Sequence, residues 1–94
     1  SATTADQVAL SVSSSVYRTL KITVQITSGS SYHSQEIMVV HNGSTVYMNE
    51  YGIVNTGSIL STFDGDINSG NIRLLVTPTN AITTYIVACT AMRV

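Results

Sequence analysis

Acidic side chains at alternating positions in the segment DGDINSG, residues 64–70, are the first candidates for chemistry in this chain. On a β-strand, Asp64 and Asp66 would lie on one face, about 6.5–7 Å apart by two strand rises. Paired carboxylates can act as general acid and base, as they do in glycoside hydrolysis. A small hydrolase that uses Asp64 and Asp66 is therefore one hypothesis. The commoner role of such residues is to supply exposed charges that keep a strand soluble.

The same segment partly follows the pattern of a calcium loop, because Asp64, Asp66 and Asn68 alternate along it. The helix–loop–helix calcium site requires glycine at its sixth position and glutamate at its twelfth. Ser69 and Leu75 occupy those positions here. We therefore favour a strand over an ion site for this segment.

Other nucleophiles and bases are present, but no spacing organises them. The sequence has His33, His41, Cys89 and many serines, yet it has neither a Gly-x-Ser-x-Gly elbow nor a cysteine-enzyme signature. No Cys/His spacing suits zinc, and no glycine-rich phosphate loop exists. We interpret Cys89, in IVACTAM, as a small buried hydrophobic residue. The prediction is a non-catalytic protein without a metal or cofactor site.

Tyrosines are the remaining candidates for a binding site. Exposed aromatic rings can stack on sugars, although carbohydrate sites favour tryptophan, which this chain lacks. Packing in the core or between subunits is the expected use of most tyrosines here. The five are Tyr17, Tyr32, Tyr47, Tyr51 and Tyr85. We retain Tyr32, Tyr47 and Tyr51 as possible ligand or interface residues.

Composition limits the classes of partner. The 94 residues suffice for one domain, and charged residues make up 10% of them with a net charge of -1. Nucleic-acid binding needs a basic footprint, which is missing, and an anionic membrane surface is disfavoured for the same reason. No apolar run approaches the length of a membrane span. A surface with 26 serines and threonines and few charges suits assembly or extracellular exposure.

The elements that must position these residues are strands. In LKITVQI, residues 20–26, apolar and polar side chains alternate, which is typical of a half-buried strand. Seven strands are expected, with residues 27–33 as a loop and residues 52–59 as a connection. Their expected ranges are 7–12, 16–28, 33–41, 44–51, 60–67, 71–77 and 82–93.

The segment VVHNGSTVY, residues 39–47, predicts a hairpin. Asn-Gly is the strongest short hairpin signal, because a type I′ turn needs positive φ at both central residues. With residues 42–43 as the loop, His41 would lie opposite Ser44, and Val39 opposite Val46. One face would then hold Ile37, Val39, Val46 and Met48, and the other Met38, Val40 and Tyr47. His41 is then the last residue of a strand, with a structural role. The turn also accounts for the N-glycosylation pattern NGS at 42–44.

A second hairpin is expected around Ser69 and Gly70. It would place Ile67 opposite Ile72 and Asp66 opposite Arg73, a pair of opposite charge that supports the register. The segment TPTNA, residues 77–81, is the next expected turn. In the last strand, the expected register directs Tyr85 and Val87 towards the core.

Together these elements predict an all-β fold, an antiparallel β-sandwich of about seven or eight strands, jelly-roll-like and built from hairpins. Residues 1–15 are expected to form an N-terminal arm and a first strand, with the arm in residues 1–6. Residues 16–94 are expected to form the sandwich domain.

The segments SQEIMVVHNGSTVYMNEYGIV and FDGDINSGNIRLLVTPTNA, followed by a β-rich end, resemble a domain of tailed phages of marine bacteria, cyanophages in particular. That domain occurs in virion structural and fibre-like proteins, and the similarity covers about residues 16–93. The matching features are Glu36, VVHNG, the Tyr-x-x-Glu-Tyr of residues 47–51, Phe63 with Asp64, and LLVTP.

The resemblance implies a β-sandwich without known catalytic residues. It also implies assembly into a virion with copies of itself, commonly as trimers in fibres or as copies on the head, and with other virion proteins of the tail, neck, fibre or head surface. The protein would be made in the host cytoplasm and become extracellular with the particle. The alternative is a glycan- or receptor-binding module, such as a fibre tip or a carbohydrate-binding domain, which would be favoured by a concave patch with Tyr32, Tyr47 or Tyr51 beside Asn or Asp.

Overall fold

The computed structural model describes residues 3–94, and these residues form seven β-strands and no helix. All seven strands lie close to their expected positions. In chain order they are β1 (Gln7–Ser13), β2 (Tyr17–Ser28), β3 (Ser31–His41), β4 (Val46–Asn55), β5 (Ser61–Asn68), β6 (Asn71–Pro78) and β7 (Thr84–Arg93).

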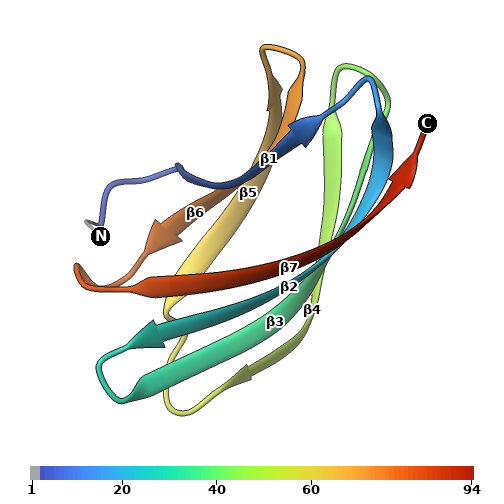
Figure 1. Cartoon of the computed structure of the whole chain (residues 1–94). Coiled ribbons are helices and arrows are strands. Elements are labelled where there is room, and N and C mark those ends of the chain that lie inside the picture. The colour runs from blue at the N-terminus through green and yellow to red at the C-terminus, as the bar shows by residue number, and fades with distance from the viewer. Residues whose placement is uncertain (1–2) are drawn as a thin grey trace.

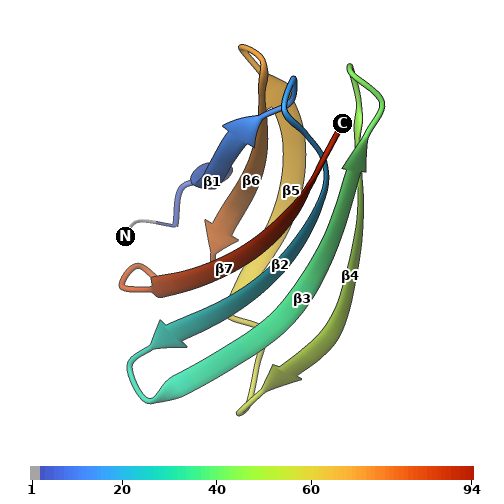
Figure 2. The same ribbon diagram turned by 45° about the vertical axis from the view of Figure 1, so that its right-hand side comes forward.

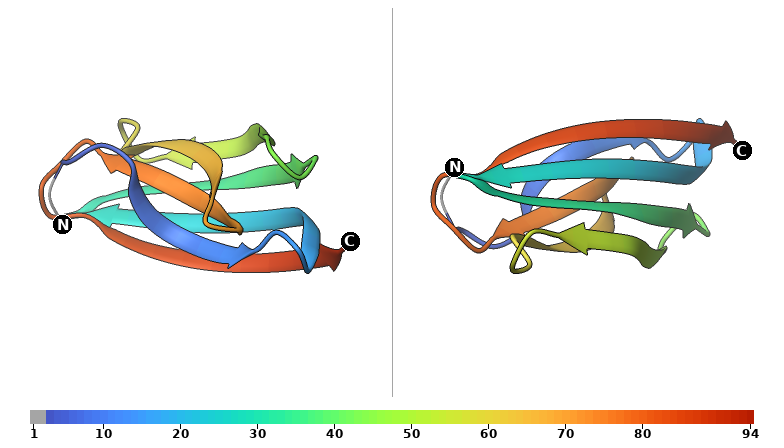
Figure 3. Two further views of the ribbon diagram at one scale, coloured as in Figure 1. Left: turned by 90° about the horizontal axis from the view of Figure 1, so that it is seen from above. Right: turned by 90° about the horizontal axis from the view of Figure 1, so that it is seen from below.

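The strands form two antiparallel sheets, which confirms the predicted β-sandwich. One sheet has three strands in the order β1-β6-β5, and the other has four in the order β4-β3-β2-β7. Figures 1 and 3 show the sheets as two layers, with β7 along one margin of the four-stranded sheet. The hairpin-connected strands β2, β3 and β4 are joined by β7, which returns beside β2 as in a Greek key.

The core comes from the alternation that the sequence shows in β2. Leu20, Ile22, Val24 and Ile26 are at most 1% exposed, while the polar residues between them face away from the core. Ile72, Leu74 and Val76 of β6 supply much of the apolar surface on the three-stranded side. These residues belong to one cluster, so a single core holds the two sheets together.

The hairpin of β5 and β6 has the predicted register. Ile67 pairs with Ile72 and Asp66 pairs with Arg73. Ser69 and Gly70 both have positive φ, 52° and 80°, as a two-residue type I′ turn requires.

The hairpin of β3 and β4 differs from the prediction by two residues. His41 lies opposite Val46, not Ser44, so the loop contains the four residues 42–45. The reason is the Asn42 side chain, whose Oδ1 accepts hydrogen bonds from the backbone N–H groups of Ser44 (3.1 Å) and Thr45 (2.9 Å). A shift of two residues preserves the faces, so Val46 and Met48 still point to the core side as expected.

Two expected connections between strands are shorter in the structure than predicted. Residues 27–33 are not a loop, because β2 continues to Ser28 and β3 starts at Ser31 after a tight turn in which Gly29 has φ +61°. β4 continues through four residues of the expected connection 52–59 and ends at Asn55. It does so across a bulge at Gly52, which has φ +64°.

Residues 7–13 form β1, the first strand expected within residues 1–15, and this strand pairs with β6 of its own chain. Of the expected arm, residues 3–6 are described, and residues 1–2 lie outside the described residues. The Asp6 backbone N–H donates a 3.0 Å hydrogen bond to Thr77 Oγ1, which ties the end of the described arm to β6.

The two sheets approach each other closely where β5 meets β4. A Cβ on Gly65 would lie 2.7 Å from Met48 Sδ and 3.0 Å from Val46 Cγ1. Glycine at this position therefore lets the edges of the two sheets close one side of the sandwich.

Candidate binding surface

The candidate tyrosines Tyr32, Tyr47 and Tyr51 all lie on one face, the side of the four-stranded sheet that points away from the core. We call this side the outer face. Alternate residues of β2 point to the core, so the residues between them lie on the outer face. The residues of β3 and β4 that pair with these lie on the outer face as well. The rows that cross from β2 to β3 to β4 on this face include Thr19–Val40–Tyr47 and Thr23–Glu36–Tyr51, and Thr27 is opposite Tyr32.

The outer face carries several exposed apolar side chains, although the chain as a whole is rich in serine and threonine. Tyr47 is 56% exposed and Tyr32 is 50% exposed, whereas Tyr51 is half-buried. Further exposed apolar side chains on this face come from three strands: Val40, Val54, Ile86 and Met92. Clustered apolar residues on one face are typical of interaction sites, while scattered ones are not.

Two shallow grooves follow this surface, and each has an exposed tyrosine beside an asparagine. The larger, of about 250 Å³, is lined by residues that include Thr19, Val40, Tyr47 and Asn49. The smaller, of about 140 Å³, lies at the far end of β4, where Tyr32 and Asn55 contribute to it. Both grooves include an aromatic residue and an asparagine, the combination that would favour a glycan-binding module.

The charges on the outer face balance each other. Lys21 Nζ lies 3.6 Å from Glu36 Oε1 on the neighbouring strand. An exposed pair of this kind contributes little to stability. Its consequence is that the middle of the face carries no net charge.

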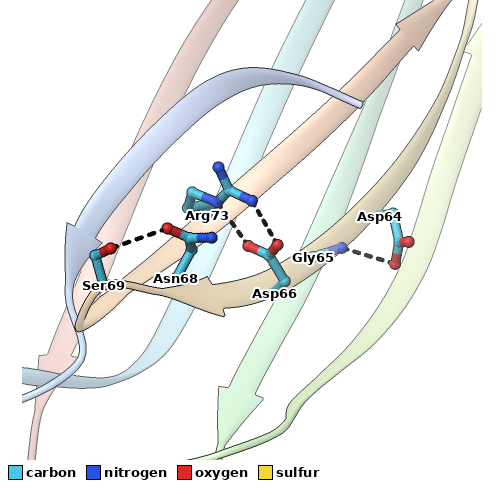
Figure 4. A network of polar contacts seen from close by, with 6 residues as sticks. All are labelled: Asp64, Gly65, Asp66, Asn68, Ser69 and Arg73. Carbon is cyan, nitrogen blue, oxygen red and sulfur yellow. Dashed lines mark hydrogen bonds and ion pairs between the residues drawn. The ribbon is translucent and has the colours of Figure 1, made fainter. Parts of the chain in front are cut away.

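The two aspartates of the hydrolase hypothesis lie on β5, away from the outer face, and their contacts are local (Figure 4). Asp66 accepts two hydrogen bonds from Arg73, at 2.7 Å from Nε and 2.6 Å from Nη2. The hydrogen bond from Arg73 holds the pKa of the Asp66 carboxyl below its usual value. Asp64 Oδ1 accepts a hydrogen bond of 2.8 Å from the Gly65 N–H. A carboxylate held ionised in a fork with arginine suits a cross-strand pair better than a proton donor.

The calcium-like segment is a strand and a turn. Ser69 Oγ donates a 3.1 Å hydrogen bond to Asn68 Oδ1 within the turn. Among residues 3–94, no three His, Cys, Asp or Glu side chains come together as metal ligands.

His41 has the structural role that the hairpin predicted. Its ring is 3% exposed, and Nδ1 accepts a 2.9 Å hydrogen bond from the Gly43 N–H. The proton of the neutral ring is then on Nε2, which donates to the Tyr17 carbonyl at 2.7 Å. His41 therefore connects the β3–β4 turn to the start of β2.

His33 has the same role at the other end of β3, and no local sequence pattern pointed to it. Its ring is 1% exposed, and Nδ1 accepts a 3.1 Å hydrogen bond from the Leu60 N–H. Nε2 donates to Gln35 Oε1 at 2.7 Å, and Gln35 Nε2 donates to Glu50 Oε1 at 2.8 Å. His33 thus holds the connection that carries the chain from one sheet to the other.

The interpretation of Cys89 as buried is wrong. Cys89 lies opposite Ile22 on the core side of the sheet, but it is exposed because β7 is the outermost strand. Partial burial still raises the pKa of its thiol. The predicted direction of Tyr85 and Val87 is confirmed, since both pack against the core, and Tyr85 OH donates a 2.8 Å hydrogen bond to Ser61 Oγ.

No helix in residues 3–94 is long and apolar enough to span a membrane. No protein-family model matches this chain, and no curated protein matches it either.

Proposed function

We propose that this chain is a non-catalytic structural module of a phage virion that associates with copies of itself and with other virion proteins. The observation that carries the proposal is the outer face, where exposed apolar side chains gather around a balanced ion pair. Such a face loses little by being removed from water, since few charges must be desolvated. The resemblance of residues 16–93 to virion structural domains supplies the biological setting.

The first test is the mass of the purified protein by light scattering over a range of concentrations. A stable trimer or another discrete oligomer supports the proposal, and a monomer at every concentration contradicts self-association. Double substitution of Val40 and Tyr47 by serine should weaken an oligomer that uses the outer face. Replacement of the exposed Ile59, which lies outside the strands, by serine is the matched control.

The virion setting has its own test. Antibodies raised against the purified chain should label particles of the phage that encodes it, seen by electron microscopy with gold conjugates. Particles without label, from a lysate that contains the protein, would contradict a structural role in the virion.

A glycan- or receptor-binding module is the second candidate, and the two grooves favour it. Each places an exposed tyrosine beside an asparagine, Tyr47 with Asn49 and Tyr32 with Asn55. A glycan array probed with the labelled protein tests this function. Binding should be lost in Tyr47→Ala or Tyr32→Ala and retained in Ile86→Ala, which removes an exposed side chain of the same face outside both grooves. An array without signal contradicts glycan binding.

A further inference from the structure

The two open sheets leave four edge strands, and these differ in how well they resist pairing with another chain. An edge strand presents unpaired N–H and C=O groups, which proteins commonly protect with charges, proline, bulges or short length. The edges are β1 and β5 in one sheet and β4 and β7 in the other.

Three of the edges have such protection. β5 carries Asp64 and Asp66, so pairing with another β5 would bring like charges together. β4 carries Glu50 and the bulge at Gly52. β1 has seven residues and a break in register between Val8 and Leu10.

β7 has none of these features over most of its length. From Thr84 to Met92 it contains no charged residue, proline or glycine, and it pairs with β2 without a register shift over that range. Its charged residue, Arg93, is at the end of the strand. Within residues 3–94, β7 is hydrogen-bonded in a sheet to β2 alone, so its other side is open, along the margin of the sheet in Figure 2.

We propose that the open edge of β7 pairs antiparallel with β7 of a second copy of this chain. The result is a twofold dimer with a continuous eight-stranded sheet. A second copy is the occupant that fits because the two edges match in length and self-pairing opposes only uncharged side chains between Thr84 and Met92. The inference rests on the self-association in the proposed function and assigns it to one strand.

The geometry of such a pair restricts its register. Directly opposed residues in an antiparallel pair share a face, so the twofold axis must lie midway between one residue and the same residue of the second copy, which are directly opposed. The greatest overlap of Thr84–Arg93 with itself puts the axis at Ala88 or at Cys89. In the second register the two Cys89 side chains are directly opposed, and in the first they are diagonal neighbours about 7–8 Å apart.

The pairing also joins the two outer faces edge to edge. Ile86 and Met92, which are 60% and 65% exposed in the single chain, would lie near the seam between the copies. A twofold contact produces a dimer or an even-numbered assembly, whereas the resemblance to virion domains implies a trimer. The measured mass therefore separates this inference from the proposed function.

The experiment compares the wild-type chain with Ala88→Lys by light scattering. Ala88 is exposed and lies opposite Thr23, so a lysine there fits the single chain and would place two like charges at the seam. Thr62→Lys is the matched control, because it adds the same charge at an exposed strand position of the other sheet, away from both the outer face and β7. Circular dichroism checks that each variant is folded, and Ala88→Glu replaces Ala88→Lys if the latter is not.

A second measurement needs no substitution. A short bismaleimide should link two wild-type chains through Cys89, and alkylation of Cys89 beforehand with the monofunctional N-ethylmaleimide, followed by its removal, should prevent the link. At equal protein concentration the bismaleimide should leave Ala88→Lys mostly unlinked.

We expect an even-numbered wild-type oligomer, a halved mass for Ala88→Lys, an unchanged mass for Thr62→Lys, and cross-linking through Cys89. A trimer, or an oligomer whose mass Ala88→Lys leaves unchanged, overturns β7 pairing and leaves the proposed function standing. A wild-type monomer at all concentrations overturns both.

Discussion

At the scale of single residues, the titratable side chains of this protein support the fold. The two histidines are buried at the ends of β3 and each accepts a backbone N–H and donates to an oxygen. Such side chains satisfy backbone groups that a connection between strands would otherwise leave unpaired. They are therefore anchors for the turns on either side of β3.

Replacement of His33 by phenylalanine tests this role. The ring volume is similar, but the Leu60 N–H loses its acceptor and Gln35 Oε1 loses its donor. We expect the free energy of unfolding to fall by about 1–3 kcal/mol, the cost of leaving buried polar groups unsatisfied. Urea unfolding measures it, with Tyr32→Phe at the exposed neighbouring position as control. Equal stabilities of wild type and His33→Phe would show that these hydrogen bonds contribute nothing to the free energy of unfolding.

The pair of Asp66 and Arg73 predicts a pH-dependent difference in stability. Because the hydrogen bond from Arg73 lowers the folded-state pKa of Asp66 from 3.8, the pair stabilises the fold above that value. The contribution is lost as the pH falls through the lower, folded-state pKa. The difference in unfolding free energy between wild type and Asp66→Asn should thus be present at pH 7 and disappear in strong acid. It should be small because both side chains are partly exposed. A difference that is independent of pH would contradict an ionic origin.

At the scale of elements, the approach of β5 to β4 depends on one position without a side chain. Gly65→Val would bring its methyl groups against Val46 and Met48. We expect a loss of about 1–3 kcal/mol from overpacking. Gly57→Ala is the control, since a Cβ there meets nothing within 4 Å and the residue is not in the positive-φ region. Chemical denaturation compares them, and a Gly65→Val variant as stable as wild type would mean that the sheets can separate at no cost.

Local sequence patterns predicted the strands and hairpins. The predicted hairpin register was correct where backbone conformation determines the turn, and wrong where a side-chain hydrogen bond determines it. Ser69-Gly70 takes two positive φ values, so the simple type I′ rule gave the correct register for β5 and β6. Asn42-Gly43 carries a stronger signal, yet the Asn42 side chain caps a four-residue loop instead. The type I′ rule is based on the backbone preferences of Asn and Gly and does not include this competing side-chain hydrogen bond.

The candidate site was less predictable because it depends on pairings across the sheet. The sequence placed Tyr47 on a face with Met38 and Val40, which the register confirms. Tyr51 shares this face by simple alternation, since it lies four residues after Tyr47 in unbroken register. That Tyr32 also shares it follows from the tight turn at Gly29, which has no distinctive local pattern and lets β3 start at Ser31. Similarly, Cys89 reads as a core residue in sequence but lies on an edge strand, and strand order is not encoded locally.

At the scale of the whole molecule, the low charge predicts how association responds to salt. With 10% charged residues and a net charge of -1, neither attraction nor repulsion between copies is strongly electrostatic. Raising the ionic strength from about 0.05 to about 1 M, which shortens the Debye length to about 3 Å, should leave the oligomer mass unchanged. Light scattering across that range decides this. Dissociation at high salt would point to ion pairs between copies and away from the outer face and β7.

The position of β7 beside β2 also has a consequence for synthesis. The β2–β3, β3–β4 and β5–β6 hairpins are local and can form as the chain leaves the ribosome, whereas the residues of β7 pair with residues of β2 that lie 57 to 76 positions earlier in the chain. Until β7 emerges, β2 is itself the margin of an incomplete sheet, and its core-forming side chains Leu20, Ile22, Val24 and Ile26 lack the neighbouring strand that shields them. A nascent chain stalled near residue 80 would therefore be prone to aggregate, and that hazard ends once β7 has been synthesised and has paired with β2.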